Sequence, residues 1–318
     1  MHKSLKRVAG LALGLLSLIV VPGLRAQSLA GPQCSNPDGS LLWEVKGPAL
    51  ERNGGSLYLF GSIHVGKPEF YPLPPRLEAL VQGADALVFE VNPEVVAEPR
   101  IAMQLQLRGM LPAGQTLDQL VPPATLAELE RVLASLGLPL RNFANYKPWM
   151  LAVLLANVQV TQLGFNPQWG LESYLLQRRR PGTPILELES WEQQLDMLES
   201  IDPALFLDYS LEEFEAGADL LDDLIAGWLC GDREALVDTL LSTSLSQDDG
   251  FYEAMFVNRN RVMAEGISRL ANAGDQDWLV VVGAAHLLGE DSVVSLLQDE
   301  GFRVTPVPLQ AQAGARVP

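Results

Sequence analysis

Two of the three histidines in this 318-residue chain end the same local pattern. His64 closes the run Gly61-Ser62-Ile63-His64, and His286 closes Gly283-Ala284-Ala285-His286. An apolar segment precedes each run, so both imidazoles are expected just beyond the carboxyl end of a buried strand. Glycine three residues earlier lets the backbone turn tightly and approach a bound group, because it has no Cβ. Ligands of open α/β sheets bind beyond such strand ends, so we expect both histidines to face one crevice.

Histidine in such a crevice can bind a metal, act as a general base or activate a nucleophile. A serine nucleophile is disfavoured because the sequence has no G-x-S-x-G elbow. A cysteine nucleophile is disfavoured because Cys34 and Cys230 lie away from both motifs. Two imidazoles with one or more carboxylates suit Zn²⁺, Mn²⁺, Co²⁺ or Fe²⁺. We therefore predict a divalent-metal site that includes His64 and His286.

Four acids are candidates to complete this site. Glu90 ends a predicted strand that returns from the His64 loop, and we predict it as a ligand or general base. Glu187 and Glu189 share one face of a short alternating segment, and Glu187 is the predicted additional ligand. A solvated strand face explains this pair equally well. Glu172 follows Gly170 at a helix start, where the helix dipole also favours an acid.

Two arginines near the C-terminal motif are candidates to stabilise an oxyanion. Arg259 and Arg261 lie two residues apart in one predicted helix. We include Arg261 among the predicted catalytic residues. The alternative is that such arginines pair with surface acids.

Both histidine motifs are flanked by the same succession of elements. The N-terminal one has a strand at 57–60, a helix opened by Pro74-Pro75 and a second strand at 86–91. The C-terminal one has a strand at 278–282, a helix through 293–297 and a last strand at 302–307. Strand, helix and strand form a βαβ unit, which implies parallel strands. The fold class is therefore α/β, with a mixed, largely parallel sheet.

The segment between the two units, at about 95–275, is mostly helical. Apolar spacing predicts helices at 125–136, 147–163, 171–179, 191–198, 211–229 and 252–270. The alternating run 184–189 predicts a further strand. We expect residues 27–318 to form a single domain, with a frayed tail at 310–318.

The N-terminus resembles a signal peptide. Lys3, Lys6 and Arg7 precede an apolar run from Val8 to Val21, and Ala26 offers a cleavage site. The alternative is an uncleaved membrane anchor, for which this run is short. The apolar stretch from Trp149 to Val160 is also too short to cross a membrane, so the mature chain is expected to have no span. Export, most simply to the periplasm, makes a Cys34–Cys230 disulfide plausible, with two buried free thiols as the alternative.

Composition excludes some classes of protein. The chain is 48% hydrophobic and 19% charged, which excludes a disordered protein. Its formal net charge is −17, so it repels phosphate backbones and is not expected to bind nucleic acid.

The two motifs resemble those of the TraB/GumN family. Leu57-Tyr58-Leu59-Phe60-Gly61-Ser62-Ile63-His64 looks like its opening motif, and Val282-Gly283-Ala284-Ala285-His286 looks like its closing GxxH motif. The Glu90 strand, Lys147-Pro148-Trp149 and Arg259-Asn260-Arg261 fit the intervening pattern, so the similarity spans about Leu42 to Val307.

The resemblance implies an activity and a fold. The family includes TIKI metalloproteases, which depend on divalent ions such as Mn²⁺ or Co²⁺, and bacterial pheromone-shutdown and polysaccharide-cluster proteins. Its fold is similar to that of erythromycin esterase and ChaN-like proteins. By position, the functional residues are His64, Glu90 and His286. Ser62 replaces a common Thr, and Glu172 replaces a common Asp.

Three hypotheses follow for function. The first is an exported metal-dependent hydrolase, peptidase-like, that activates water for attack on a peptide or small-molecule substrate. The second is a non-catalytic envelope protein that sequesters a peptide, a pheromone or a metal complex. The third is an esterase that uses histidine as a general base without metal.

Overall fold

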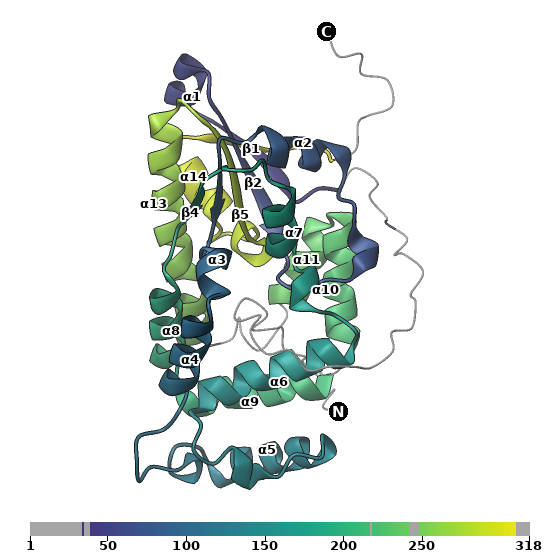
Figure 1. Ribbon diagram of the computed structural model, residues 1–318, viewed down its shortest axis with the longest axis vertical. Helices are drawn as coiled ribbons and strands as arrows, with labels where there is room; N and C mark the ends of the chain where they lie inside the picture. Colours follow the sequence, from purple (N-terminus) through teal and green to yellow (C-terminus); the bar gives the residue numbers. More distant parts are fainter. Residues whose placement is uncertain (1–33, 35–38, 217, 242–247, 310–318) are drawn as a thin grey trace, which may run out of the picture.

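The computed structural model describes residue 34 and residues 39–216, 218–241 and 248–309 (Figure 1). The predicted signal peptide, residues 1–26, and the predicted frayed tail, residues 310–318, lie outside these residues. Within the described part of the chain, no helix is both long and apolar enough to cross a membrane.

One six-stranded sheet organises the protein, with strand order β4-β3-β5-β2-β1-β6. The strands are β1 (Leu42–Lys46), β2 (Ser56–Ser62), β3 (Ala86–Phe89), β4 (Ile185–Glu187), β5 (Asp277–Gly283) and β6 (Arg303–Pro306). Strands β4, β3, β5 and β2 run parallel. The mixed, largely parallel sheet is confirmed.

Strand β1 makes the sheet mixed, and the sequence analysis did not predict it. It pairs antiparallel with β2 on one side and with β6 on the other. Its short pattern Leu42-Trp43-Glu44-Val45-Lys46 is buried at three positions and partly buried at two. Because β1 is antiparallel to both neighbours, β6 points in the same direction as β2 and β5, as the βαβ prediction requires.

Each βαβ unit is interleaved with the other. Strand β5 lies between β2 and β3, the two strands of the N-terminal unit, which are joined through α2 (Pro75–Gly83). The C-terminal unit joins β5 to β6 through α14 (Val293–Asp299). Strands β2 and β5 pair from Ser56↔Asp277 to Ser62↔Gly283. The two motifs therefore leave neighbouring strands at the same edge, as the prediction of one crevice requires.

Helices cover the sheet on both sides, which explains why β5 is apolar along most of its length. Helices α13 (Asn258–Ala273) and α14 lie on one side, and α2 and α7 (Leu171–Arg178) lie on the other (Figure 1). The inner residues of β5, from Trp278 to Val282, are all buried. This continuous core holds the strand ends that carry the histidine motifs.

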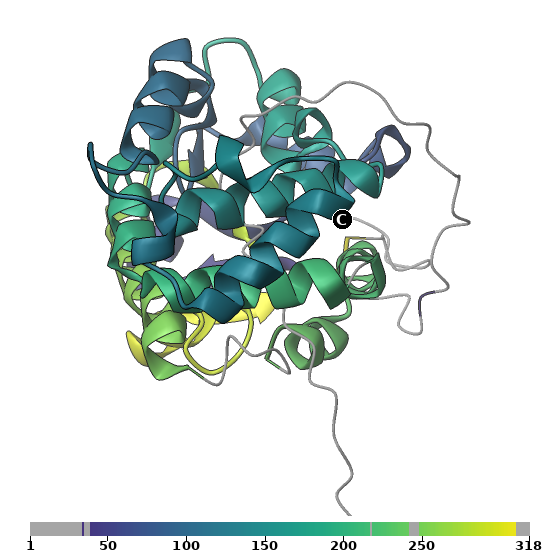
Figure 2. The ribbon, with the colours of Figure 1, turned by 90° about the horizontal axis from the view of Figure 1, so that it is seen from below.

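The middle segment is largely helical, as predicted. Helices α5 (Pro123–Ser135), α6 (Pro148–Gln162) and α9 (Pro203–Ala216) lie below the sheet (Figures 1 and 2), and α9 packs against the other two. Many helices have a proline in their first turn. A backbone N–H at that position would have no intrahelical acceptor, so proline costs the helix no hydrogen bond there. The remaining helices are α1 (Pro48–Asn53), α3 (Pro93–Val96), α4 (Pro99–Arg108), α8 (Trp191–Ser200), α10 (Ala218–Cys230), α11 (Arg233–Leu241) and α12 (Asp249–Tyr252).

Two predicted helices differ from the observed ones. The predicted helix at 211–229 is divided between α9 and α10. The predicted helix at 252–270 begins in α12, passes through a turn of π-helix at Glu253–Val257 and continues as α13. A π turn rotates the side chains that follow it, and such turns often lie at functional sites.

A disulfide joins Cys34 to Cys230, as predicted, with the two Cα atoms 5.2 Å apart. Cys230 is the last residue of α10. The bond fixes the segment before β1 to a helix that packs near the end of β2.

Candidate functional site

His64 lies two residues beyond the end of β2, in a loop fixed by the start of α7. The backbone N–H of Leu171 donates to the Ile63 carbonyl at 3.1 Å. A Cβ on Gly170 would lie 2.3 Å from the His64 carbonyl oxygen, so only glycine allows this approach. Glu172, in the first turn of α7, accepts hydrogen bonds from His64 Nδ1 at 2.9 Å and from the Ser62 hydroxyl at 2.6 Å. The helix start therefore orients the imidazole through its Nδ1 side.

His286 lies in a 3-10 turn, Ala284–Leu287, directly after β5. Its Nδ1 is 2.6 Å from Asn260 Oδ1. The Asn260 amide donates its Nδ2 hydrogen to the Asp291 carbonyl at 2.8 Å, which leaves Oδ1 to accept from His286. Nδ1 is therefore the protonated nitrogen, and the lone pair is on Nε2. That Nε2 lies 3.9 Å from Glu90 Oε1.

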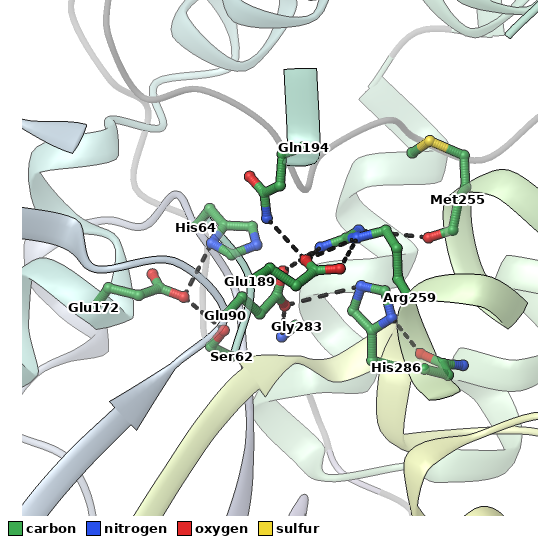
Figure 3. Close-up of polar contacts among 11 residues, drawn as sticks. Ser62, His64, Glu90, Glu172, Glu189, Gln194, Met255, Arg259, Gly283 and His286 are labelled. Atoms are coloured by element: carbon green, nitrogen blue, oxygen red, sulfur yellow. Dashed lines mark hydrogen bonds and ion pairs between the residues drawn. The ribbon is translucent and has the colours of Figure 1, made fainter. Parts of the chain in front are cut away.

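Glu90 follows β3 and lies between the two imidazoles (Figure 3). Its Oε1 accepts from the Gly283 backbone N–H, and its Oε2 accepts from Arg259 Nη2 at 2.7 Å. Arg259 also donates to Glu189, from Nε and from Nη2 at 2.8 Å. Gln194 donates to the same Glu189 carboxylate at 3.3 Å. Glu90, Arg259 and Glu189 are all buried, so this network is shielded from bulk water.

The two motifs and Glu90 converge on one point beside Gly283. A Cβ added there would lie 3.1 Å from Glu90 Oε1, 3.5 Å from His286 Cδ2 and 3.6 Å from His64 Nε2. Gly283 and Gly61 both have negative or extended φ values rather than left-handed ones. From the sequence, these glycines are expected to allow a tight turn of the backbone and its close approach to a bound group. The structure supports the close approach, since the missing side chain leaves room between the three groups.

The two imidazoles differ in charge. Burial alone would lower the pKa of His64, but the Glu172 carboxylate and its hydrogen bond raise that pKa to about 9. Burial, followed by the Arg259 charge, lowers the pKa of His286 to about 3. Burial would raise the pKa of Glu90, but His286, Arg259 and His64 together lower it to about 2. At neutral pH, without a bound ion, the cluster therefore holds a charged His64, a neutral His286 and an ionised Glu90.

Two cavities meet at His64. The larger, of about 210 Å³, is bordered by Glu90, Glu172, Gln168, Ser173 and Gln194 together with apolar side chains from α3 and β3. The smaller, of about 120 Å³, is bordered by His64, Arg259 and His286 at one end and by α10 and α11 at the other. The cluster is thus buried in part but reached from both cavities.

The structure brings three predicted site residues together and leaves two outside. His64, His286 and Glu90 lie in the cluster. Arg261 is exposed and donates to Asn258, because residues two apart on a helix differ by about 200° around its axis. Arg259 therefore faces the cluster, and Arg261 cannot.

Glu187 also lies outside the cluster. It is exposed and accepts the Asn92 backbone N–H at 3.0 Å. Strand β4 ends at Glu187, and the N–H of Glu189 turns in to donate to the Glu90 carbonyl at 2.7 Å. The alternation that placed both acids on one face stops there, so Glu189 enters the cluster instead.

The sequence assigned no role to Asn260, which appears there only within the Arg259-Asn260-Arg261 segment, and it did not single out Gln194. Asn260 lies between the two arginines and is buried in the helix, where an asparagine has low intrinsic preference. That low preference, in a helix close to a predicted site, is a usable signal. Gln194 lies on a partly exposed helix face, and nothing in its pattern distinguishes it from a surface glutamine.

In the described part of the chain, no three His, Cys, Asp or Glu side chains already surround one point closely enough to hold a metal ion. The carboxylate of Glu90 is instead directed to the Gly283 N–H and to Arg259.

Comparisons with known proteins identify relatives over most of the chain. An uncharacterized protein of Escherichia coli K12, YbaP, is 28% identical over 244 residues, which are 76% of this chain and 87% of YbaP. Metalloprotease TIKI2 of Danio rerio is 25% identical in an alignment 340 residues long with its gaps, which covers 87% of this chain and 64% of TIKI2. Metalloprotease TIKI1 of Homo sapiens is 24% identical in an alignment 332 residues long with its gaps, which covers 85% of this chain and 62% of TIKI1. No solved structure matches the chain.

The family model described as TraB/PrgY/gumN matches residues 41–306. This span contains all six strands, both histidine motifs and every residue of the cluster. The chain therefore belongs to the TraB/PrgY/gumN family.

Proposed function

We propose that the protein is a divalent-metal-dependent hydrolase that acts on peptide bonds. The observation that carries this proposal is the convergence of His64, His286 and Glu90 on the space left by the missing side chain of Gly283. The similarity to TIKI metalloproteases, at about a quarter identity, supports the same activity.

The donor set fits a divalent ion. Metal-binding histidines usually give their second ring nitrogen to an oxygen acceptor, which fixes the tautomer and the ring orientation. Both imidazoles meet this requirement, since each Nδ1 faces an oxygen, of Glu172 or of Asn260. The Nε2 atoms are thereby left toward Glu90. We propose His64, His286 and Glu90 as the ligands.

The charges of the cluster also fit. Glu90, Glu172 and Glu189 carry three negative charges against the one positive charge of Arg259. Burying an unbalanced charge is costly. Because the pKa of His64 is raised to about 9, its imidazole keeps a proton at neutral pH and supplies one of the missing positive charges. A divalent ion would balance the two surplus charges and displace that proton from His64.

The roles of the chain's own groups follow from their contacts. When bound, a divalent ion supplies Lewis acidity toward water and toward a substrate carbonyl. Glu90 is held between a backbone N–H and Arg259, and its pKa of about 2 makes it a weak base, so we assign it as a ligand. Glu172 borders the larger cavity and is the carboxylate positioned to accept a proton. Arg259 holds Glu90 and Glu189 in place rather than a substrate oxygen.

We also propose that the protein is exported, to the periplasm. The Cys34–Cys230 disulfide supports this, because such bonds persist in oxidising compartments.

Metal content tests the proposal directly. Protein purified without a histidine tag would be loaded with Mn²⁺, Co²⁺ or Zn²⁺ and analysed by mass spectrometry, together with His64→Ala and His286→Ala. We expect about one ion per chain for the wild type, none for either variant, and peptide hydrolysis only in the loaded wild type. Glu187→Gln, an exposed acid outside the cluster, is the matched control and should retain both.

Circular dichroism would verify that the histidine variants fold. Failure of the wild type to bind any of the three ions would refute the metal site. Full turnover by a folded His64→Ala protein would refute the assignment of that ligand.

A further inference from the structure

The smaller cavity has two chemically different ends. At one end it meets His64, Arg259 and His286 of the cluster. At the other it is enclosed by Leu221, Leu224, Ile225 and Trp228 of α10 and by Leu236 and Leu240 of α11. Apart from Ser62 and the three charged or ionisable groups of the cluster, the described side chains that line this cavity are apolar.

The polar atoms near the apolar end are already paired. The Trp228 indole N–H donates to the Gly61 carbonyl at 2.9 Å, in a buried contact. The Ser62 hydroxyl donates to Glu172, on the side of the larger cavity. A ligand group that enters this end therefore meets carbon surface, and a polar group placed there would lose its hydrogen bonds with water without replacement.

We propose that this cavity receives one apolar side chain of the substrate, next to the bond that is cleaved. This inference rests on the proposed function, because it takes the cluster as the place of cleavage. A cavity of about 120 Å³ is close to the engineered apolar cavity of about 150 Å³ that holds benzene. It therefore suits a phenyl or a branched aliphatic side chain, such as those of Phe, Leu and Ile.

The larger cavity suits a different part of the same substrate. Gln168, Ser173 and Gln194 border it together with the cluster's carboxylates. Such groups pair with the main-chain N–H and C=O groups of an extended peptide. Because both cavities meet at His64, a bound peptide lies across the cluster with its apolar side chain on the α10 side.

The test measures binding in the absence of metal, so it does not depend on hydrolysis. N-acetyl-4-fluorophenylalanine amide, an uncharged probe with one ring, would be titrated into the full chain and followed by fluorine NMR in the presence of a chelator. Leu224→Trp and Leu240→Phe each add volume to the cavity wall without changing the cluster. Leu186→Trp, at an exposed leucine on β4, is the matched control.

We expect the wild type and Leu186→Trp to bind the probe equally, and each cavity variant to bind it about tenfold more weakly. N-acetylleucine amide should compete for the site, and N-acetylserine amide should not. Unfolding temperatures identify any variant that fails to fold, in which case the other cavity variant decides. No binding by the wild type, or equal binding by a folded cavity variant, overturns the inference.

The same wild-type sample, loaded with Mn²⁺ and given a peptide library, tests the proposed function separately. Probe binding without any peptide hydrolysis overturns the peptidase and leaves the side-chain cavity standing. Hydrolysis with the same residue preference in wild type and in a folded Leu224→Trp protein overturns the cavity and leaves the peptidase standing.

Discussion

The two GxxH motifs are alike in sequence and position but opposite in electrostatic state. Each follows a central parallel strand, and Ser62 pairs with Gly283 where the two strands end. His64 faces a carboxylate, and its pKa is raised to about 9. His286 is buried and faces an amide oxygen, and its pKa is lowered to about 3.

The difference shows that a local motif sets where an imidazole lies but not its charge. The groups that set the charge come from elsewhere in the chain: Glu172 on α7 raises the pKa of His64, and burial together with Arg259 on α13 lowers the pKa of His286. In the metal-free protein, one histidine then carries a compensating proton and the other offers a lone pair. In the proposed metal site, the two histidines would therefore lose different things on binding: His64 a proton, and His286 none.

Arg259 is the cation that pairs with the two buried carboxylates beside the motifs, and its removal should have the largest effect. In Arg259→Gln, the buried Glu90 and Glu189 lose their counter-ion, so we expect a loss of about 3–5 kcal/mol in the free energy of unfolding. Urea unfolding in the presence of a chelator measures this loss. Arg261→Gln, at an exposed position, should change it by less than about 0.5 kcal/mol.

A double variant tests the cause of that loss. Adding Glu189→Gln to Arg259→Gln removes one of the two uncompensated carboxylates and should restore part of the stability. If the double variant is as unstable as the sum of the single ones, charge compensation by Arg259 is not the reason.

The second prediction concerns pH and separates the two histidines. His64 binds its proton more tightly in the folded protein than in the unfolded one. Its contribution to the free energy of unfolding is therefore fully present below pH 6.5 and is lost as pH rises toward about 9. His286 binds its proton less tightly in the folded protein than in the unfolded one. Its contribution to the free energy of unfolding is therefore fully present above pH 6.5 and is lost as pH falls toward about 3. Metal-free protein should be most stable near pH 6.5.

The free energy of unfolding should fall by about 3 kcal/mol between pH 6.5 and 9 because of His64. It should fall by about the same amount between pH 6.5 and 4.5 because of His286. Chelated protein unfolded by urea across this range provides the measurement. His64→Gln or Glu172→Gln should flatten the alkaline slope alone, and His286→Gln the acid slope alone. A single variant that flattens both slopes equally would contradict the separation.

The third prediction concerns the tautomer of His286. Asn260→Ala removes the oxygen that holds Nδ1–H, so we expect a roughly 10- to 100-fold loss of metal affinity. Competitive titration with a chelator measures this change. Asn258→Ala, two residues earlier on an exposed face, should leave the affinity unchanged.

The smallest expected effects are those of alanine substitutions at the two motif glycines, Gly61 and Gly283. In Gly61→Ala the new Cβ would lie 3.1–3.2 Å from Ala284, and we expect a loss of about 1–2 kcal/mol in unfolding free energy. In Gly283→Ala the new Cβ would fill the space between Glu90 and the imidazoles, so metal affinity should fall more than stability. The reverse pattern would show that Gly283 serves packing.

The parallel strands and the approach of His64, His286 and Glu90 to one another could be predicted from the sequence, because strand periodicity and glycine placement are local signals. Sequence reasoning missed β1, which is short and carries charged residues at two of its five positions. It could not order the strands, because pairing depends on contacts across more than two hundred residues.

The choice between neighbouring charged residues also lay beyond the sequence. Arg259 and Arg261 differ only in helix phase, which the π turn at Glu253–Val257 alters. Glu187 and Glu189 differ only in where β4 ends. A two-residue shift in the phase of α13, about 200° around its axis, would bring Arg261 to the side that Arg259 occupies.

The interleaved strand order also constrains how the protein is made. Strand β5, at 277–283, is inserted between β3 and β2, so the centre of the sheet stays open until these residues have been synthesised. Contacts of such long sequence separation form slowly. His64 therefore meets His286 only after the more than two hundred residues between them have been synthesised. A chain synthesised only as far as β4 has no assembled cluster, so the proposed hydrolysis could not begin before folding is complete.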